Sequence, residues 1–251
     1  MSEQSELSGR TAIVVGASRG LGRGIATAVA EAGAAVVAVS RSETDYPAPA
    51  GGGSIKPEVA NAREATLAPS LIDTYQPDAV IVVAGATPRM EPLQEQDWEA
   101  FSAPWQTDVQ IAFHWLGEAL RKPLRPGSKV IVFSSGAILN AGGSPLSGGY
   151  AGAKAMQRFM TGYAQGESKR AGLDITFSAI MPRFAPETSI GSTAVAAYSK
   201  LAGMSEEKFL SHQGPLLTPE IAGSAMVELL VADSVAPGYL LTGDGLQKPP
   251  S

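Results

Sequence analysis

Short apolar runs rich in β-branched residues recur along the chain and alternate with longer stretches of amphipathic pattern. The runs that predict strands are 11–15, 35–39, 79–83, 129–133, 174–180 and, more briefly, 239–241. Their apolar residues stand at successive positions rather than at every second one, which is typical of strands buried on both faces of a parallel sheet.

The stretches between these runs have the apolar spacing of helices. Helices are predicted at about 20–32, 63–75, 97–121, 149–171 and 219–231. Because strand and helix alternate, the crossovers are expected to be right-handed and the helices to cover both faces of the sheet. The pattern therefore predicts an α/β fold, a Rossmann-type doubly wound parallel sheet of six or seven strands.

Two segments interrupt this alternation. Residues 47–54 have the Pro, Ala and Gly content of a linker, but strands are expected on both sides, so we interpret them as a mobile loop within a single domain spanning 1–251. Residues 187–215 are too long for a simple connection and carry scattered apolar side chains, which predicts a substrate lid. An apolar face packed on the core or on a neighbouring subunit is the alternative.

Composition narrows the class of protein. The 251 residues are 44% hydrophobic and 17% charged, enough for a sizeable core, and the net charge of -5 argues against a nucleic-acid partner. The absence of cysteine excludes disulfides and thiolate chemistry, and two separated histidines give no metal site. The polar start, 1–9, lacks the apolar core of a secretory signal, and no apolar run is long enough to span a membrane, so we expect a cytoplasmic protein.

A glycine-rich turn, Gly16-Ala17-Ser18-Arg19-Gly20-Leu21-Gly22, follows the first strand and leads into a helix. Glycine permits positive φ and lets a pyrophosphate approach backbone N–H groups at the positive end of that helix, so the turn predicts a dinucleotide site. The same residues also fit GxSxG, the nucleophile elbow of α/β-hydrolases. That alternative is the weaker one, because fewer than twenty residues precede Ser18 and the only late histidine is His212.

The end of the second strand bears on the choice of cofactor, since NAD enzymes usually place an acid there. Here stand Ser40 and Arg41, and Arg19 in the glycine turn adds a second cation. A guanidinium and hydroxyls attract a 2′-phosphate, so NADP(H) is favoured over NAD(H). Alternatively, Arg41 is a solvated loop residue, because Glu43 and Asp45 follow closely.

A candidate proton-transfer pair lies at the start of a predicted helix. Tyr150 and Lys154 are four residues apart, which places both side chains on one helix face. An ammonium favours the phenolate and so lowers the pKa of a neighbouring tyrosine. Ser134 and Ser135 end the strand before it, at the sheet edge where ligands of open α/β folds bind, although serines are also common turn formers.

Taken together, these residues make the chain resemble the short-chain dehydrogenase/reductase family over nearly its whole length. The motifs occur in the family's order: the glycine turn 16–22, Ala84-Gly85, Ser134-Ser135, Tyr150-Ala151-Gly152-Ala153-Lys154, Pro182 and Thr188.

The resemblance implies roles for individual residues. Tyr150 would be the general acid/base, Lys154 would lower the tyrosine pKa and hold the nicotinamide ribose hydroxyls, and Ser135 would orient the substrate oxygen. By the same resemblance, Thr188 would approach the nicotinamide carboxamide and Asn61 the adenine. The residues expected to bind the cofactor are Gly16, Ser18, Arg19, Gly20, Leu21, Gly22, Ser40, Arg41, Asn61, Ala84, Gly85, Tyr150, Lys154, Pro182 and Thr188.

Several positions depart from the family pattern. Val82-Val83 replaces the usual pair of asparagines, and Asp108 stands where the family's helix asparagine supports a water chain to the lysine. Asp108 either favours the ammonium form of Lys154 through its charge or supplies only its backbone carbonyl.

The other departures lie nearer the substrate. The spacing from serine to tyrosine is two residues longer than expected, through Gly142-Gly143-Ser144-Pro145, which keeps Ser134 as an alternative to Ser135. Arg183 follows Pro182 where the family often has glycine, and would alter the nicotinamide pocket or place a cation beside the substrate.

We therefore predict an NADP(H)-dependent oxidoreductase that interconverts ketones and secondary alcohols, with Ser135, Tyr150, Lys154 and Asp108 as its catalytic group. The alternative is a non-catalytic dinucleotide-binding protein on the same fold, with a redox-sensing or interaction role. If the resemblance holds, the helices that start near 97 and 149 form the interface of a homodimer or homotetramer.

Overall fold

The computed structural model describes residues 6–140 and 143–249, and the strands in this part of the chain form one sheet. In sequence order they are β1 Thr11–Val15, β2 Ala35–Ser40, β3 Ser54–Val59, β4 Ala79–Val82, β5 Lys129–Phe133, β6 Thr176–Pro182, β7 Gly238–Thr242 and β8 Gly245–Gln247. Their spatial order is β3-β2-β1-β4-β5-β6-β7-β8, and only the β7–β8 pair is antiparallel. The predicted parallel, doubly wound sheet is confirmed.

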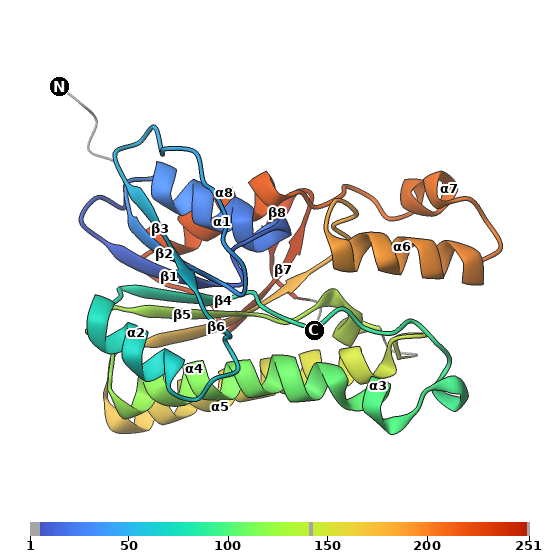
Figure 1. Ribbon diagram of the computed structural model, residues 1–251, viewed down its shortest axis with the longest axis horizontal. Helices are drawn as coiled ribbons and strands as arrows, with labels where there is room; N and C mark the ends of the chain where they lie inside the picture. The colour runs from blue at the N-terminus through green and yellow to red at the C-terminus, as the bar shows by residue number, and fades with distance from the viewer. Residues whose placement is uncertain (1–5, 141–142, 250–251) are drawn as a thin grey trace.

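Helices cover both faces of this sheet (Figure 1). One face carries α1 (Gly20–Glu31) and α8 (Pro219–Val231). The other carries α2 (Leu67–Tyr75), α4 (Gln110–Arg121) and the long α5 (Gly148–Ala171). The remaining helical elements are α3 Trp98–Pro104, α6 Ser189–Leu201, α7 Glu206–Ser211, the 3-10 turns η1 Leu93–Glu95 and η3 Gly136–Leu139, and the π-helical turn η2 Trp105–Val109.

The core consists of two layers, one on each side of the sheet. Along β1, Ala12 and Val14 belong to the layer under α1 and α8, whereas Ile13 and Val15 belong to the layer under α2, α4 and α5. All four side chains are buried, because successive residues of a strand point to opposite faces. This is the burial that the uninterrupted apolar runs predict.

The sheet has more strands than the six or seven expected, because β3 and β8 carry weak strand signals. β3 is an edge strand that includes the exposed residues Lys56 and Pro57. A charge and a proline are tolerated at an edge and discourage further strand pairing there. β8 has only three residues and pairs with β7 across a tight turn.

The connection between β2 and β3 contains no helix, so strict alternation of strand and helix fails at residues 41–53. The glycines of this loop pack closely on the end of α1. A Cβ atom on Gly53 would lie 2.2 Å from the carbonyl oxygen of Ala30, and one on Gly51 would lie 1.6 Å from that of Glu31. The linker-like composition therefore serves close packing at this point. The mobility expected of this loop stays a prediction.

The helix expected at 97–121 is divided into α3, η2 and α4. Pro104 has no backbone N–H to donate within the helix, and the π-helical turn follows it directly. This turn holds Asp108, whose side chain is fully buried. The irregularity thus brings a carboxylate into the interior beside the sheet.

The order of the strands reverses between β1 and β4, which are neighbours in the sheet. In open α/β sheets, ligands bind beyond the carboxyl ends of the strands at such a point. The loops after β1, β4, β5 and β6 meet at this edge, and α6 and α7 lie beyond the end of β6 (Figure 1). Among the described residues, no helix has the length and apolar character that a membrane span requires.

Candidate active site

The glycine turn after β1 is so tight that side chains would collide with it. Gly16 has a φ of +94°, and a Cβ atom there would lie 2.6 Å from the backbone nitrogen of Ala84. A Cβ atom on Gly22 would lie 2.0 Å from the carbonyl oxygen of Gly16. The turn therefore presents bare backbone at the N-terminus of α1, which fits a dinucleotide pyrophosphate. It also brings Gly16 and Ala84, predicted separately as cofactor-binding residues, into contact.

A second contact joins the turn to the start of α6, in the segment that follows β6. Gly20 has a φ of +55°, and a Cβ atom built there would lie 3.1 Å from Cγ2 of Thr188. Thr188 caps α6 by accepting a hydrogen bond from the backbone N–H of Gly191, and its hydroxyl donates to the carbonyl of Ala185. The predicted residues Gly20 and Thr188, far apart in sequence, are thus neighbours. Pro182 is the last residue of β6, on the same edge.

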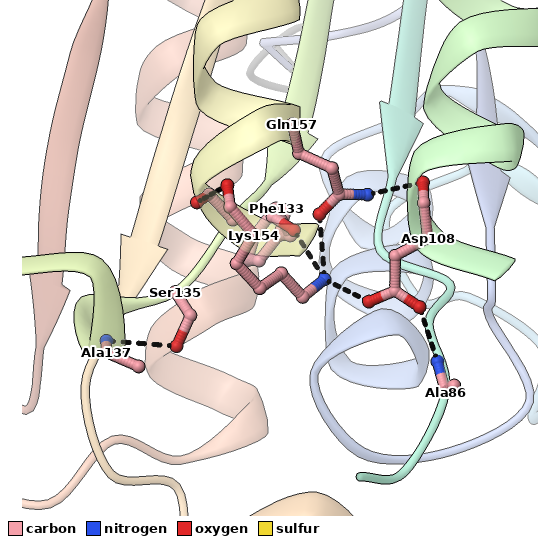
Figure 2. A network of polar contacts seen from close by, with 8 residues as sticks. Ala86, Asp108, Phe133, Ser135, Ala137, Lys154 and Gln157 are labelled. Carbon is pink, nitrogen blue, oxygen red and sulfur yellow. Dashed lines mark hydrogen bonds and ion pairs between the residues drawn. The ribbon is translucent and has the colours of Figure 1, made fainter. Parts of the chain in front are cut away.

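Lys154 lies at the centre of a buried polar network (Figure 2). Its Nζ lies 3.0 Å from Oδ2 of Asp108 and donates hydrogen bonds to Oε1 of Gln157 at 2.9 Å and to the carbonyl of Phe133 at 3.0 Å. Oδ1 of Asp108 accepts a hydrogen bond of 2.7 Å from the backbone N–H of Ala86. Three elements, β5, η2 and α5, therefore hold one ammonium group.

The carboxylate of Asp108 keeps this ammonium charged. Burial alone would lower the pKa of Lys154, but the negative charge of Asp108, with a contribution from Tyr150, outweighs it and raises the pKa above its usual value. The lysine is only 3% exposed and Asp108 is 0% exposed. Both groups of Asp108 have partners here: its carboxylate faces Lys154, and its backbone carbonyl accepts a hydrogen bond from Gln157.

Tyr150 stands one turn before Lys154 on α5, and Nζ of Lys154 lies 5.6 Å from the centre of its ring. Within the described part of the chain its hydroxyl has no hydrogen-bond partner. The phenol is therefore beside the Lys154 ammonium, as the sequence predicts, and its oxygen makes no hydrogen bond to a described protein group.

The two serines after β5 differ in how their hydroxyls are used. Ser134 is 2% exposed and donates to the carbonyl of Lys154 at 2.7 Å, so its hydroxyl is committed inside the fold. The Ser135 oxygen accepts from the backbone N–H of Ala137 at 3.2 Å, which leaves its proton for another group. This difference favours Ser135 over Ser134 for contact with a substrate oxygen. The structure records no contact between Ser135 and Tyr150.

The residues predicted at the adenine end are more dispersed. Ser40 is buried and its hydroxyl donates to the carbonyl of Ser42, whereas Arg41 and Arg19 are exposed. Neither guanidinium has a protein partner among the described residues. Asn61 is exposed after β3, and its side-chain oxygen accepts from the backbone N–H of Arg63. The two guanidinium groups are therefore available to a ligand, and no hydrogen bond or ion pair joins Ser40, Arg41, Arg19 and Asn61 to one another.

Sequence reasoning missed two residues. Gln157 is fully buried three positions after Lys154 and reaches it from the same helix face; a polar residue at that spacing on a buried stripe was the available signal. Tyr46 donates from the β2–β3 loop to the carbonyl of Ala17 at 2.7 Å and thereby fixes the glycine turn. Arg23 lies 5.2 Å from the centre of its ring. No sequence motif marks Tyr46.

The hydrolase alternative finds no support in this arrangement. An elbow serine needs a histidine within hydrogen-bond reach, but the hydroxyl of Ser18 has no such contact with His114 or His212. His114 packs against Phe113 within α4, and His212 is exposed after α7. The glycine turn is thus left with its nucleotide interpretation.

The doubly wound sheet carries a glycine turn after its first strand and a tyrosine–lysine pair on α5. The model of the family described as short chain dehydrogenase matches residues 10–197, more than half of the chain. The protein therefore belongs to the short-chain dehydrogenase family of oxidoreductases. No curated protein is similar enough to this chain to count as a relative.

Two solved structures have a similar fold. A short chain dehydrogenase from Mycobacterium avium is 22% identical with a TM-score of 0.73, over 98% of this chain and 86% of that one. A protein assigned as an NAD(P) dependent gluconate 5-dehydrogenase from Beutenbergia cavernae, with bound NADP at low occupancy, is 24% identical with a TM-score of 0.75, over 95% and 96%. At these identities the likeness concerns the fold.

Proposed function

We propose that the protein is an NADP(H)-dependent oxidoreductase that interconverts ketones and secondary alcohols, with Tyr150 as the general acid/base. The observation that carries the proposal is the position of Tyr150, beside a buried charged lysine on the sheet edge that also holds the glycine turn. A free phenol next to an ammonium, near a dinucleotide site, is suited to proton transfer to or from a substrate oxygen.

The protein's residues divide the work between binding and proton transfer. When bound, a nicotinamide dinucleotide supplies or accepts a hydride. The bare backbone at Gly16, Gly20 and Gly22 would hold its pyrophosphate, and Thr188 and Pro182 would line its nicotinamide end. Ser135 would donate a hydrogen bond to the carbonyl oxygen while Tyr150 delivers a proton to it. In the reverse direction Tyr150 would take that proton from the alcohol.

The preference for NADP(H) rests on the free cations at the adenine end. Arg41 and Arg19 are exposed, and no described carboxylate neutralises either of them. Two unpaired guanidinium groups favour a 2′-phosphate over a ribose hydroxyl. The structural neighbour that holds NADP is consistent with this preference.

We also propose that the region 187–215 is a lid over the substrate. Tyr198 of α6 contacts the segment before Tyr150: its hydroxyl lies 2.8 Å from that of Ser147 and 3.1 Å from that of Ser144. Its ring packs with Phe184 and Phe209, which gives the lid an apolar inner cluster. The alternative, packing on the core, is supported by the burial of Val195. If the Tyr198 hydroxyl holds residues 187–215 against the segment before Tyr150, the Tyr198→Phe variant should be cut faster by proteases within 187–215 than wild type; unchanged proteolysis would contradict this.

Assembly into a homodimer or homotetramer is supported by exposed aromatic side chains on α4 and α5. Phe113, Phe159 and Tyr163 are 60%, 68% and 60% exposed. Large apolar groups gathered on two neighbouring helices favour contact with another copy of the chain. Sedimentation equilibrium would test this, and a monomer at micromolar concentration would contradict it. A cytoplasmic location stays a prediction from composition.

One observation favours a second candidate, a dinucleotide-binding protein without catalysis. The Lys154 ammonium donates two hydrogen bonds to protein groups and forms an ion pair with Asp108, so contact with a ribose hydroxyl would compete with these protein contacts. A sensor would tolerate such an arrangement as well as an enzyme would.

The experiment that separates the two candidates measures NADPH oxidation over a panel of ketones, together with NADPH affinity by fluorescence titration. We expect turnover on at least one ketone, a loss of about 10² to 10⁴ in kcat for Tyr150→Phe, and nearly unchanged NADPH affinity. Tight NADPH binding without turnover on any ketone would favour the sensor. Equal loss of binding and turnover in Tyr150→Phe would show a structural role for the tyrosine.

A further inference from the structure

The ammonium of Lys154 makes two hydrogen bonds and one ion pair with protein groups. An ammonium has three N–H donors and no acceptor, and its nitrogen lies 2.9 to 3.0 Å from three oxygen atoms, those of Gln157, Phe133 and Asp108. Because these acceptors come from α5, β5 and η2, the position of the charge is fixed from three directions. A flexible lysine on a solvated surface would have no such constraint.

Gln157 uses both ends of its amide in this network. Its Oε1 accepts from Lys154, and its Nε2 donates to the backbone carbonyl of Asp108 at 2.8 Å (Figure 2). The side chain thus connects the π-helical turn to the lysine without an intervening solvent molecule. Gln157 and Asp108 are both 0% exposed, so the contacts lie in the interior, where they are stronger than in water.

The two oxygens of the Asp108 carboxylate have different partners: one accepts a hydrogen bond and the other forms an ion pair. Oδ1 accepts from the backbone N–H of Ala86, and Oδ2 pairs with Lys154. Gly85 leaves the space for it, since a Cβ atom on Gly85 would lie 2.7 Å from Oδ2. The result is a buried ion pair of no net charge, in which Asp108 of η2 is the negative member.

We propose that Asp108 and Gln157 are positioning residues that fix Lys154 as one half of a buried ion pair, so that Tyr150 experiences a dipole instead of an isolated cation. The inference rests on the proposed role of Tyr150 in proton transfer. It assigns to Gln157 a function that no motif indicates, and to Asp108 a function that depends on its charge.

The charged or titratable groups recorded against Lys154 are two: Asp108 from η2 and Tyr150 from α5. Phe133 of β5 contributes a backbone carbonyl and Gln157 a neutral amide. A carboxylate near a phenol disfavours the phenolate, so removing the charge of Asp108 should shift the pH profile of a reaction that uses the phenolate to lower pH. The pH midpoint of alcohol oxidation should therefore move down by about one unit in Asp108→Asn.

The test compares the pH profiles of kcat and kcat/KM for wild type, Asp108→Asn, Gln157→Met and Thr161→Val. Thr161 is the matched control, because it is a buried polar residue on α5 whose hydroxyl donates to the backbone carbonyl of Gln157 and not to its side-chain amide or to Lys154. We expect a lower midpoint in Asp108→Asn, a lower kcat with an unmoved midpoint in Gln157→Met, and neither change in Thr161→Val. A loss of kcat at every pH in Asp108→Asn, with the midpoint unmoved, would overturn the proposal.

A second readout needs no activity and separates this proposal from the proposed function. Lys154→Met leaves the Asp108 carboxylate buried without its partner, which should lower Tm by about 6 to 20 °C. Adding Asp108→Asn removes that charge, so the double variant should recover at least half of the loss. Additive losses in the double variant would contradict the buried pair, even if wild type reduced no ketone.

Discussion

The glycine turn allows a prediction in which crowding and ligand binding are tested separately. Gly22 and Gly24 stand two residues apart on α1, and each lacks room for a side chain. A Cβ atom on Gly22 would lie 2.0 Å from the carbonyl oxygen of Gly16 in the turn, and one on Gly24 would lie 2.2 Å from that of Pro219 at the start of α8. The two substitutions to alanine are therefore matched in crowding and differ in what they displace.

The expected cost is similar for both. Forcing a methyl group into a packed site costs about 1 to 3 kcal/mol, and alanine returns about 0.5 to 1 kcal/mol of helix propensity. The net loss of up to about 2.5 kcal/mol corresponds to a fall in Tm of up to about 10 °C for a chain of this size. Thermal unfolding followed by circular dichroism measures it.

The effect on NADPH binding should differ. In Gly22→Ala the carbonyl of Gly16 must move, and with it the backbone that faces the pyrophosphate, so we expect affinity to fall at least about tenfold, the equivalent of 1.4 kcal/mol. In Gly24→Ala the displaced atom belongs to α8, and affinity should stay within about twofold of wild type. Equal affinity losses in the two variants would refute the assignment of this turn as the pyrophosphate site.

Three further predictions concern separate parts of the molecule. Arg41→Ala should weaken NADPH binding by about 10- to 100-fold and leave NADH binding unchanged, because a charge-assisted hydrogen bond contributes about 1.5 to 3 kcal/mol; equal effects on both cofactors, by fluorescence titration, would contradict a 2′-phosphate contact. Gly162→Ala should raise stability by about 0.5 to 1 kcal/mol in chemical denaturation, since a Cβ atom there meets nothing within 4 Å on α5; a loss would contradict the open surface. The pKa of Lys154 is raised from 10.5 in the folded protein. The ammonium therefore contributes fully to stability below pH 10.5, and this contribution is lost as the pH rises through the higher pKa of the folded state. The difference in Tm between wild type and the double variant Asp108→Asn/Lys154→Met should stay constant between about pH 7 and 9, and a decline over that range would contradict this sign.

Much of the fold was predictable because its signals are local. The strands β1 and β5 coincide with the apolar runs at 11–15 and 129–133, and α8 coincides with the predicted helix 219–231. A buried apolar run and a capped helical pattern can both be recognised from the local sequence. β3 was not recognisable in the same way. Its Lys56 and Pro57 are acceptable only because the strand lies at the sheet edge, a fact of tertiary structure.

In the candidate site, too, some features were predictable from local sequence and others depend on tertiary structure. Tyr150 and Lys154 were predictable from their spacing on one helix, and the glycine turn from its position after a strand. The partners of Lys154 were only partly predictable, because the π-helical turn that directs Asp108 inward has no sequence signature beyond Pro104. The carbonyl of Phe133 and the N–H of Ala86 are backbone groups, whose role in a site cannot be predicted from residue type.

The central claim is that this chain transfers a hydride between nicotinamide and a carbonyl carbon while Tyr150 supplies the proton. The most direct measurement supplies NADPH carrying deuterium at the transferable C4 position, with a ketone that supports turnover, and follows the label by mass spectrometry. The account predicts one deuterium on the carbinol carbon of the product with wild type, and at most about 1% of that rate with Tyr150→Phe at unchanged NADPH affinity. Labelled product formed equally fast by Tyr150→Phe would contradict it.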